Sequence, residues 1–329
     1  MSDSEERPGP LGEIVSTPGA DVALPSHALT VTGSPATTPA EIELSGVVQV
    51  SERQQARREN WRLIRRRPAF IVGVFIVLVW VVCAIFGDRI TPHSPLDFRA
   101  GTHLSPRAKF PFGTDEQGRD VLSRVMAGAR DVLKVAPLAA LLGVLFGVIV
   151  GMVMGYFGRW LDNVLGRIVE AFLALPVILL ALLAVSTLGS SPAVVIGVVA
   201  ALFTPVVART VRSAVVAERD LDYVTSAKLR GESSAFVMFK EILPNVSGPI
   251  IVELTVRIGY AVFTVATLSF LGAGPQPPSP DWGAQVSEGF RNISADIWWT
   301  TFFPAAAIAS LVIAANLIAD SVQSVLEAS

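Results

Sequence analysis

Six apolar stretches, separated by charged or proline- and glycine-rich segments, constrain what this chain can fold into. They cover residues 68–86, 132–157, 168–188, 194–208, 250–271 and 299–317. A helix that rises ~1.5 Å per residue needs roughly 20 apolar residues to cross a ~30 Å hydrocarbon core. The composition agrees, because 51% of the 329 residues are hydrophobic and only 16% are charged, against about 25% charged in soluble domains. The sequence therefore predicts an all-α integral membrane protein with six transmembrane helices.

Basic residues between the stretches predict the orientation of these helices. Cytoplasmic loops of membrane proteins are enriched in Lys and Arg. The loop at 272–298 has only Arg291, whereas the loop at 87–131 mixes arginines with acids. We therefore expect both termini in the cytoplasm of a multi-pass protein of the plasma (inner) membrane. The basic residues assigned to the inner side are Arg53, Arg57, Arg58, Arg62, Arg65, Arg66, Arg67, Arg159, Arg167, Arg209, Arg212, Arg219, Lys228, Arg230 and Lys240.

Three segments follow from this reading. Residues 1–58 are dominated by Pro, Gly, Ser, Thr and Ala without apolar periodicity, which predicts a disordered cytoplasmic tail. Residues 59–131 hold the basic flank, the first span and an outer loop. Residues 132–321 hold the remaining spans, with a long inner loop at 218–245.

The inner loop at 218–245 is the longest charged interruption in the second half, and it predicts two short helices. Asp220 is expected to cap the first, at 221–230, and Gly231 to end it in a left-handed conformation. A serine, Ser233 or Ser234, is expected to cap the second, and Pro244 to stop it.

An apolar knob outside any span follows within this loop, at Phe236, Val237, Met238 and Phe239. Exposed apolar surface of this kind marks a partner site. The alternative is an amphipathic loop that lies on lipid headgroups.

The same loop resembles the cytoplasmic coupling loop of ABC importer permeases. In that family a Glu-Ala-Ala triplet precedes a glycine and, after a fixed gap, a Leu-Pro pair. The resemblance implies a coupling helix that seats in a groove of an ATPase subunit. This sequence departs from the pattern in the triplet, which keeps only its last alanine, and at Glu241, where the pattern has Ile. The matching positions are Thr225, Ser226, Ala227, Gly231, Leu243 and Pro244, with Phe236 and Phe239 in the docking surface.

The end of the outer loop has the pattern of a capping box, with Thr114 as the cap and Gln117 three residues on. An apolar stripe that begins at Val121 predicts an interfacial helix leading into the second span. The segment 112–124 resembles a signature of the C-type permeases of dipeptide and oligopeptide importers. Its residues either contact substrate or only build a turn and cap, and both readings stay open. They include Gly113, Thr114, Asp115, Gly118, Arg119 and Asp120.

Glycines recur every four residues in the second span, at Gly143, Gly147, Gly151 and Gly155. Small residues on one helix face allow another helix to approach closely in a membrane. We expect close helix packing on this face, either within the chain or against a partner permease.

Few ionisable residues lie at membrane depth. Glu253 and Arg257 are four apart, so they share a helix face and are expected to pair. The pair either marks a polar translocation path or is only structural. The three histidines are too scattered for a metal site, and no phosphate-binding G-x-x-x-x-G-K-[ST] loop occurs. We therefore expect no catalytic set, no metal and no cofactor on this chain.

A second segment, 268–283, also resembles the C-type permeases, and Trp282, Trp298 and Trp299 beside it are expected to anchor at the membrane interface. The resemblance implies a type I ABC importer permease that moves peptides by alternating access. It also implies a B-type permease partner, two ATPase subunits that carry ATP and Mg, an extracytoplasmic substrate-binding protein and contact with membrane lipids. Import of nickel, glutathione or another small ligand is the alternative, followed by a proton-driven carrier that uses Glu170 and Glu253. A net charge of -2 does not suggest nucleic acid as a partner.

Overall fold

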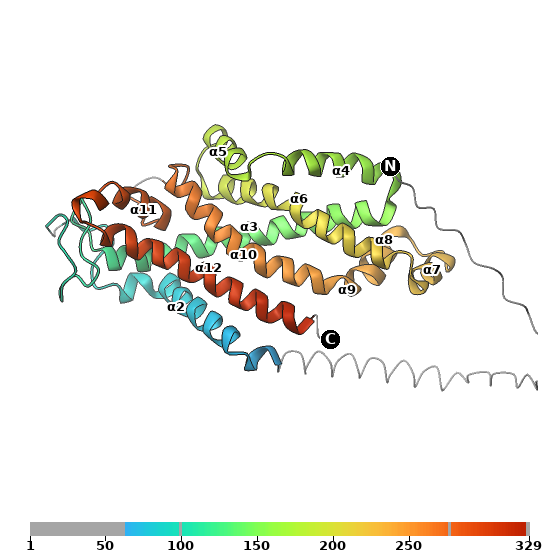
Figure 1. Cartoon of the computed structure of the whole chain (residues 1–329), viewed down its shortest axis with the longest axis horizontal. Helices are drawn as coiled ribbons and strands as arrows, with labels where there is room; N and C mark the ends of the chain where they lie inside the picture. The colour runs from blue at the N-terminus through green and yellow to red at the C-terminus, as the bar shows by residue number, and fades with distance from the viewer. Residues whose placement is uncertain (1–62, 99–100, 276–277, 327–329) are drawn as a thin grey trace, which may run out of the picture. The chain divides into compact units, whose positions relative to one another are not determined.

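Long helices dominate the computed structural model, which describes residues 63–98, 101–275 and 278–326 (Figure 1). All of these residues belong to one unit, residues 53–329. Within the described ranges the regular structure is helical, apart from two isolated bridges, Arg107–Phe110 and Thr114–Asp120. The expected all-α membrane architecture is therefore confirmed. The predicted tail and the arginines from 53 to 62 lie outside the described residues.

Five helices in the described ranges are long and apolar enough to cross a membrane: α2 (Pro68–Ile90), α3 (Val121–Phe157), α6 (Pro192–Glu218), α10 (Ser247–Phe270) and α12 (Trp299–Leu326). α6 extends ten residues beyond the apolar stretch that predicted it. α3 begins eleven residues before its stretch, so the expected interfacial helix is not separate but forms the first turns of α3.

The third predicted span is broken rather than straight. It consists of α4 (Arg159–Leu173) and α5 (Val177–Leu188), which meet at an angle of 88°. Pro176 stands at the break, where its ring cannot continue the helix. The prediction of one span over 168–188 was therefore wrong in shape, and six spans are reached only if this bent pair counts as one.

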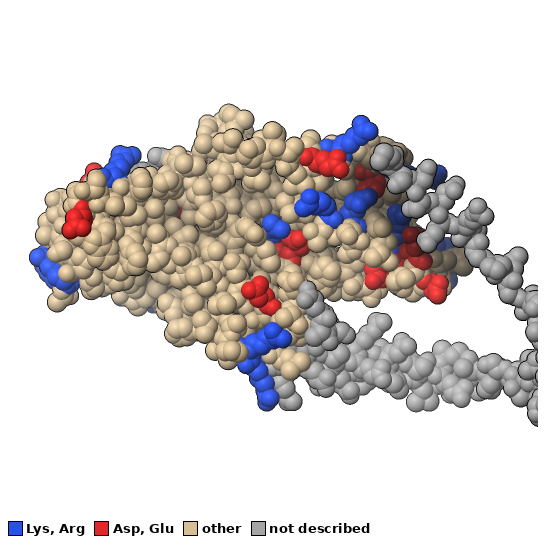
Figure 2. Space-filling view, in the orientation of Figure 1, with Lys and Arg blue, Asp and Glu red and all other residues tan. Residues whose placement is uncertain are grey.

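Short helices lie at the two ends of this helix bundle (Figure 1). Charged side chains gather toward these ends in Figure 2, with a largely uncharged band between them. We call the described residues within 91–120 and 272–298 the α11 end, and residues 219–246 the α7 end. The α11 end holds α11 (Trp282–Phe290) and η2 (Ile293–Ala295); the α7 end holds α7 (Asp222–Leu229), α8 (Ser234–Phe236), η1 (Val237–Ile242) and α9 (Leu243–Asn245).

The glycine face of α3 packs against α6 of the same chain. A Cβ built on Gly151 would lie 2.6 Å from the carbonyl oxygen of Ala208, well inside van der Waals contact. A Cβ on Gly147 would lie 2.5 Å from Cβ of Val207. Small residues thus bring the two helix backbones together. The alternative left open by the sequence is resolved in favour of packing within the chain. Gly143 and Gly155 meet Phe203 and Val215 in the same way.

Two of the three tryptophans expected at the membrane interface are buried instead. Trp282 is fully buried, packs edge-on against Trp80 with ring centroids 4.7 Å apart, and donates from Nε1 to the Val125 carbonyl at 2.7 Å. Trp299 is also buried and donates from Nε1 to the Thr114 carbonyl at 3.1 Å. Both indole N–H groups find protein acceptors, as buried tryptophans require. Of these three tryptophans, Trp298 alone is exposed.

Candidate functional site

The first helix of the α7 end starts one residue later than predicted. α7 begins at Asp222, and its N-cap residue is Leu221, without a side-chain cap. Asp220 therefore does not cap the helix; its exposed carboxylate pairs with Arg219 at 3.3 Å. α7 ends at Leu229, and Gly231 follows the C-cap residue Arg230 with a φ of +78°, the left-handed conformation expected of it.

The second helical segment starts as predicted and continues further. Ser233 caps α8, accepting from the backbone N–H of Phe236 at 3.2 Å. The chain passes through a π-helical turn, η1, into α9. Pro244 lies in the first turn of α9, where a missing N–H costs nothing, so it does not stop the segment as expected.

The apolar knob is only half exposed. Phe236 and Phe239 are exposed, whereas Val237 and Met238 are buried in a cluster with valines of α3 and α6. Leu229, at the end of α7, is 83% exposed and was not among the residues predicted for this surface. Its position just before Arg230 and Gly231, outside any span, is the signal that was available. Leu221, before α7, is exposed as well. We give the name docking patch to the three exposed apolar side chains between the end of α7 and η1: Leu229, Phe236 and Phe239.

The weak triplet has a structural explanation. Ala227 is fully buried in the cluster below α7, whereas Thr225 and Ser226 are exposed. Packing therefore constrains only the last position of the triplet, where Ala227 keeps the small side chain. Glu241, the second departure, is within 3.4 Å of Arg230 and so links the two helical segments across Gly231.

Polar contacts also join the α7 end to the long helices. Tyr223 donates to the Glu218 carboxylate at 2.6 Å. Burial together with this hydrogen bond raises the pKa of Tyr223 to about 12, so its hydroxyl stays protonated and keeps donating. Lys228 donates to the Arg219 carbonyl and lies over the Tyr156 ring of α3 at 5.4 Å. The α7 end is therefore fastened to both α6 and α3.

At the α11 end, the predicted capping box does not exist. Thr114 donates to the Gly101 carbonyl and accepts from the Leu104 N–H, so it closes a loop and starts no helix. α3 begins at Val121, and Asp120 is its cap, accepting from the N–H of Ser123 at 3.3 Å. Thr and Asp both cap helices, so the sequence pattern alone does not distinguish Thr114 from Asp120. Gly118, which lies between these two residues in a left-handed conformation, prevents the helix from starting earlier.

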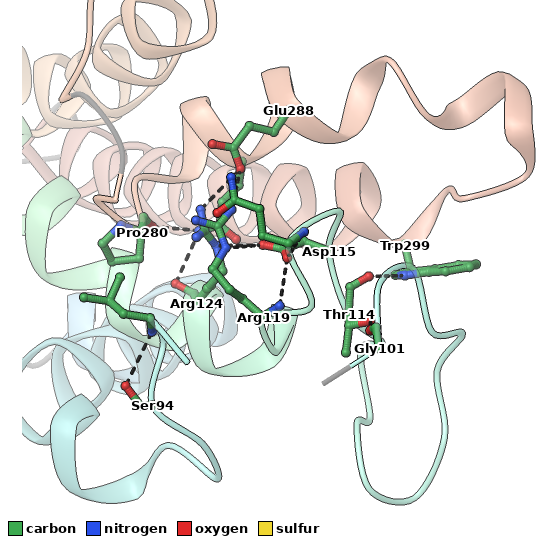
Figure 3. A network of polar contacts seen from close by, with 12 residues as sticks. Ser94, Gly101, Thr114, Asp115, Arg119, Arg124, Pro280, Glu288 and Trp299 are labelled. Carbon is green, nitrogen blue, oxygen red and sulfur yellow. Dashed lines mark hydrogen bonds and ion pairs between the residues drawn. The ribbon is translucent and has the colours of Figure 1, made fainter. Parts of the chain in front are cut away.

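A buried ion network occupies this end, and its members lie together in Figure 3. Asp115 accepts from the N–H of Arg119 at 2.8 Å and from its Nε at 2.6 Å. Arg119 also donates to Glu288 of α11 at 3.0 Å, and Arg124 approaches the same Glu288 oxygen at 3.4 Å. The two arginine side chains are 2% and 1% exposed. The signature segment is thus joined to α11, a contact that was not predicted from the sequence.

The pair in α10 forms as expected. Arg257 Nε donates to Glu253 at 2.8 Å, and Thr210 of α6 donates to the other oxygen of Glu253, also at 2.8 Å. The Arg257 guanidinium lies 5.2 Å from the centre of the Tyr260 ring and 5.8 Å from that of Phe203. Glu170 is exposed on α4, and it is distant in sequence from Glu253 and Arg257. Within the described residues, no three His, Cys, Asp or Glu side chains gather as metal ligands would.

Comparison with known proteins identifies the family. Residues 147–329 match the model of the binding-protein-dependent transport system inner membrane component, and residues 56–106 match the N-terminal TM domain of oligopeptide transport permease C. The dipeptide transport system permease protein of Alkalihalophilus pseudofirmus is 34% identical over 82% of this chain and 89% of its own length. The corresponding dipeptide permease of Bacillus subtilis is 35% identical over 82% and 85%.

A third relative has a different named substrate. The glutathione transport system permease protein of Salmonella typhimurium is 38% identical over 85% of this chain and 93% of its own length. The family model covers more than half of the chain, and the described part is a bundle of apolar helices. This chain therefore belongs to the family of binding-protein-dependent transport system inner membrane components, which are membrane-embedded permease subunits.

Proposed function

We propose that this chain is the C-type permease subunit of an ATP-driven importer of dipeptides or oligopeptides, and that it forms half of the translocation path. Relatives named for dipeptide transport support the peptide assignment. Glutathione, itself a small peptide, is the second candidate substrate, because a relative named for it is 38% identical.

The docking patch is the observation that carries this proposal. Leu229, Phe236 and Phe239 are exposed on a segment that is otherwise fixed by buried side chains. Apolar side chains held outward on a rigid loop form a surface for a protein partner. We expect an ATPase subunit to cover this patch in the cytoplasm, with both termini of the chain on the same side.

The remaining partners follow from the family. A B-type permease would form the other half of the path, two ATPase subunits would bind ATP and Mg, and an extracytoplasmic protein would deliver the substrate. This chain would hydrolyse nothing itself. On this topology the α11 end faces the outside.

The helix packing suggests how motion at the docking patch reaches the other end. α7 follows α6 after three residues, and α6 is held against α3 along the glycine face. α3 has 37 residues, so it is roughly 55 Å long and runs from the α7 end to the ion network. A rigid-body displacement of α7 would therefore tilt α6 and α3 together, which is one known route of long-range switching.

Substitution of Gly231 tests the coupling role. Gly231→Pro imposes a φ near -65° where the chain has +78°, so the two halves of the loop cannot keep their arrangement. We expect the variant to insert in the membrane and to lose substrate uptake, with any remaining ATP hydrolysis no longer coupled to it. Gly231→Ala, which tolerates a positive φ at a cost of about 1–2 kcal/mol, should give an intermediate defect.

Uptake assays decide between an ATP-driven importer and a proton-driven carrier. Uptake of a labelled dipeptide that stops on ATP depletion supports the importer, and competition by excess glutathione or nickel identifies the substrate. Normal uptake by the Gly231→Pro variant contradicts the proposal. Uptake that survives ATP depletion but collapses with the proton gradient would instead favour a carrier that uses Glu170 and Glu253.

A further inference from the structure

A polar cavity of about 210 Å³ lies at the α11 end, beside the ion network shown in Figure 3. Arg119 and Arg124 from the signature segment line it on one side, and Gln285 and Glu288 of α11 line it on the other. A single ordered water needs only roughly 10–15 Å³ of such a cavity. The space therefore has room for a group considerably larger than one water molecule.

The guanidinium groups of Arg119 and Arg124 differ in how closely they contact the carboxylates of Asp115 and Glu288. Arg119 makes short contacts to both carboxylates, at 2.6 Å to Asp115 and 3.0 Å to Glu288. Arg124 makes only longer ones, at 3.6 Å and 3.4 Å to the same two groups. Its side chain is 1% exposed, and among the described residues its Nη1 has no hydrogen-bond partner.

A buried guanidinium with an unpaired N–H requires an explanation. Arginine carries five N–H donors, and burying a charged donor without an acceptor is costly. Buried polar groups are paired in the great majority of cases. Because Arg124 lines the cavity, a molecule that enters it and displaces Glu288 can supply the missing acceptor.

The chemistry of that molecule follows from the groups already present. Asp115 is held by two backbone N–H groups and by Arg119, so it cannot move away. Glu288 is different, because its side chain is 34% exposed and one of its oxygens is shared by both arginines. Glu116 and Arg291 also line the cavity, so its three acids and three arginines cancel formally, and an added anion binds best where it replaces Glu288. A carboxylate fits this place, since planar guanidinium groups hold carboxylates with charge-assisted hydrogen bonds.

We propose that this cavity is a carboxylate-binding site, in which Arg124 and Arg119 hold the terminal carboxylate of a short peptide at the α11 end. The carboxylate chemistry rests on the cavity itself, whereas the peptide as its source rests on the proposed function. The site would receive the peptide before it enters the path between the permeases.

Protection of an introduced cysteine tests the site directly. Ser287 lines the cavity and is half-buried, so Ser287→Cys in a Cys83→Ala background places one thiol there. The full chain is purified in detergent with whatever subunits accompany it, and the rate of maleimide labelling is measured. The probes are the dipeptide Ala-Ala, its C-terminal amide, sodium acetate and sodium chloride.

We expect Ala-Ala to slow labelling about tenfold at ten times its dissociation constant, acetate to slow it at higher concentration, and the amide and chloride to have no effect. Arg124→Gln should abolish the protection, and Arg124→Lys should restore part of it. Thermal unfolding of each variant shows whether the chain remains folded, and a matched thiol at Thr255, away from the cavity, should be unprotected in every case.

Other outcomes overturn the site. No protection by any probe would mean that ordered water alone satisfies Arg124. Equal protection by Ala-Ala and its amide would show that the carboxylate is not what binds, and protection by an added substrate-binding protein alone would make this a docking surface. Protection by Ala-Ala and acetate in a chain that imports no peptide would leave the site intact and refute only the proposed substrate.

Discussion

A single methyl group added to the glycine face should destabilise the bundle. The Cβ of Gly151→Ala would lie 2.6 Å from the Ala208 carbonyl oxygen, 0.8 Å short of the 3.4 Å at which ordinary contact begins. The obstacle is backbone, so α3 and α6 must separate along their packed length. Overpacking of this kind costs about 1–3 kcal/mol. Against this, alanine is favoured over glycine in a helix by about 1 kcal/mol.

Gly197→Ala in α6 is the matched control. Gly197 is also inside a helix, but nothing lies within 4 Å of an added Cβ. It should therefore gain the helix preference without the strain, by about 1 kcal/mol. The difference between the two variants isolates the strain, because the helix preference is the same in both.

Reversible unfolding of the purified chain in mixed detergent micelles measures both free energies. We expect Gly151→Ala to be less stable than Gly197→Ala by about 1–3 kcal/mol. Equal stabilities would show that the two helices are not in close contact, and the reasoning on the glycine face would fail.

Three further predictions concern charged and exposed groups. Burial raises the pKa of Asp281, so the contribution of Asp281 to stability falls as the pH rises above the ordinary Asp pKa of about 4. Asn at this position can still cap α11 and stays uncharged. In thermal unfolding scans, Asp281→Asn should therefore be more stable than the parent chain toward neutral pH. Glu253→Gln and Arg257→Gln should each lower the free energy of unfolding by about 1–3 kcal/mol. In a double-mutant cycle, the double variant should lose less than the sum of the two single losses. Strict additivity would contradict the pairing. If an ATPase subunit covers the docking patch, as proposed, Leu229→Asp should lose it on co-purification and Leu229→Met should keep it. Stability should change little, because the Leu229 side chain is exposed.

Much of the architecture could be predicted because a membrane imposes long apolar helices. The glycine spacing indicated close packing, and Gly231 and Ser233 behaved as local chemistry requires. Span boundaries were less predictable at α6 and α3, because both helices continue into polar regions where hydropathy no longer marks them.

The α11 end could not be predicted from local patterns. Trp282 and Trp299 look like interfacial residues in sequence, yet acceptors from distant segments, the carbonyls of Val125 and Thr114, allow both to be buried. The burial of Arg119 and Arg124 likewise depends on Glu288, more than 160 residues away. Such pairings are set by tertiary structure and leave no periodic signal in the sequence.

The break between α4 and α5 has a consequence for how the chain is made in the cell. α5 has 12 residues, so it is roughly 18 Å long, well short of a ~30 Å hydrocarbon core. Lipid cannot satisfy interrupted backbone at that depth, which is tolerated only where protein or water covers it. Leu179 and Leu183 on α5 are also exposed in the single chain. A copy inserted without a covering subunit is therefore expected to be an orphan that membrane proteases remove, so the supply of its partner would set its abundance.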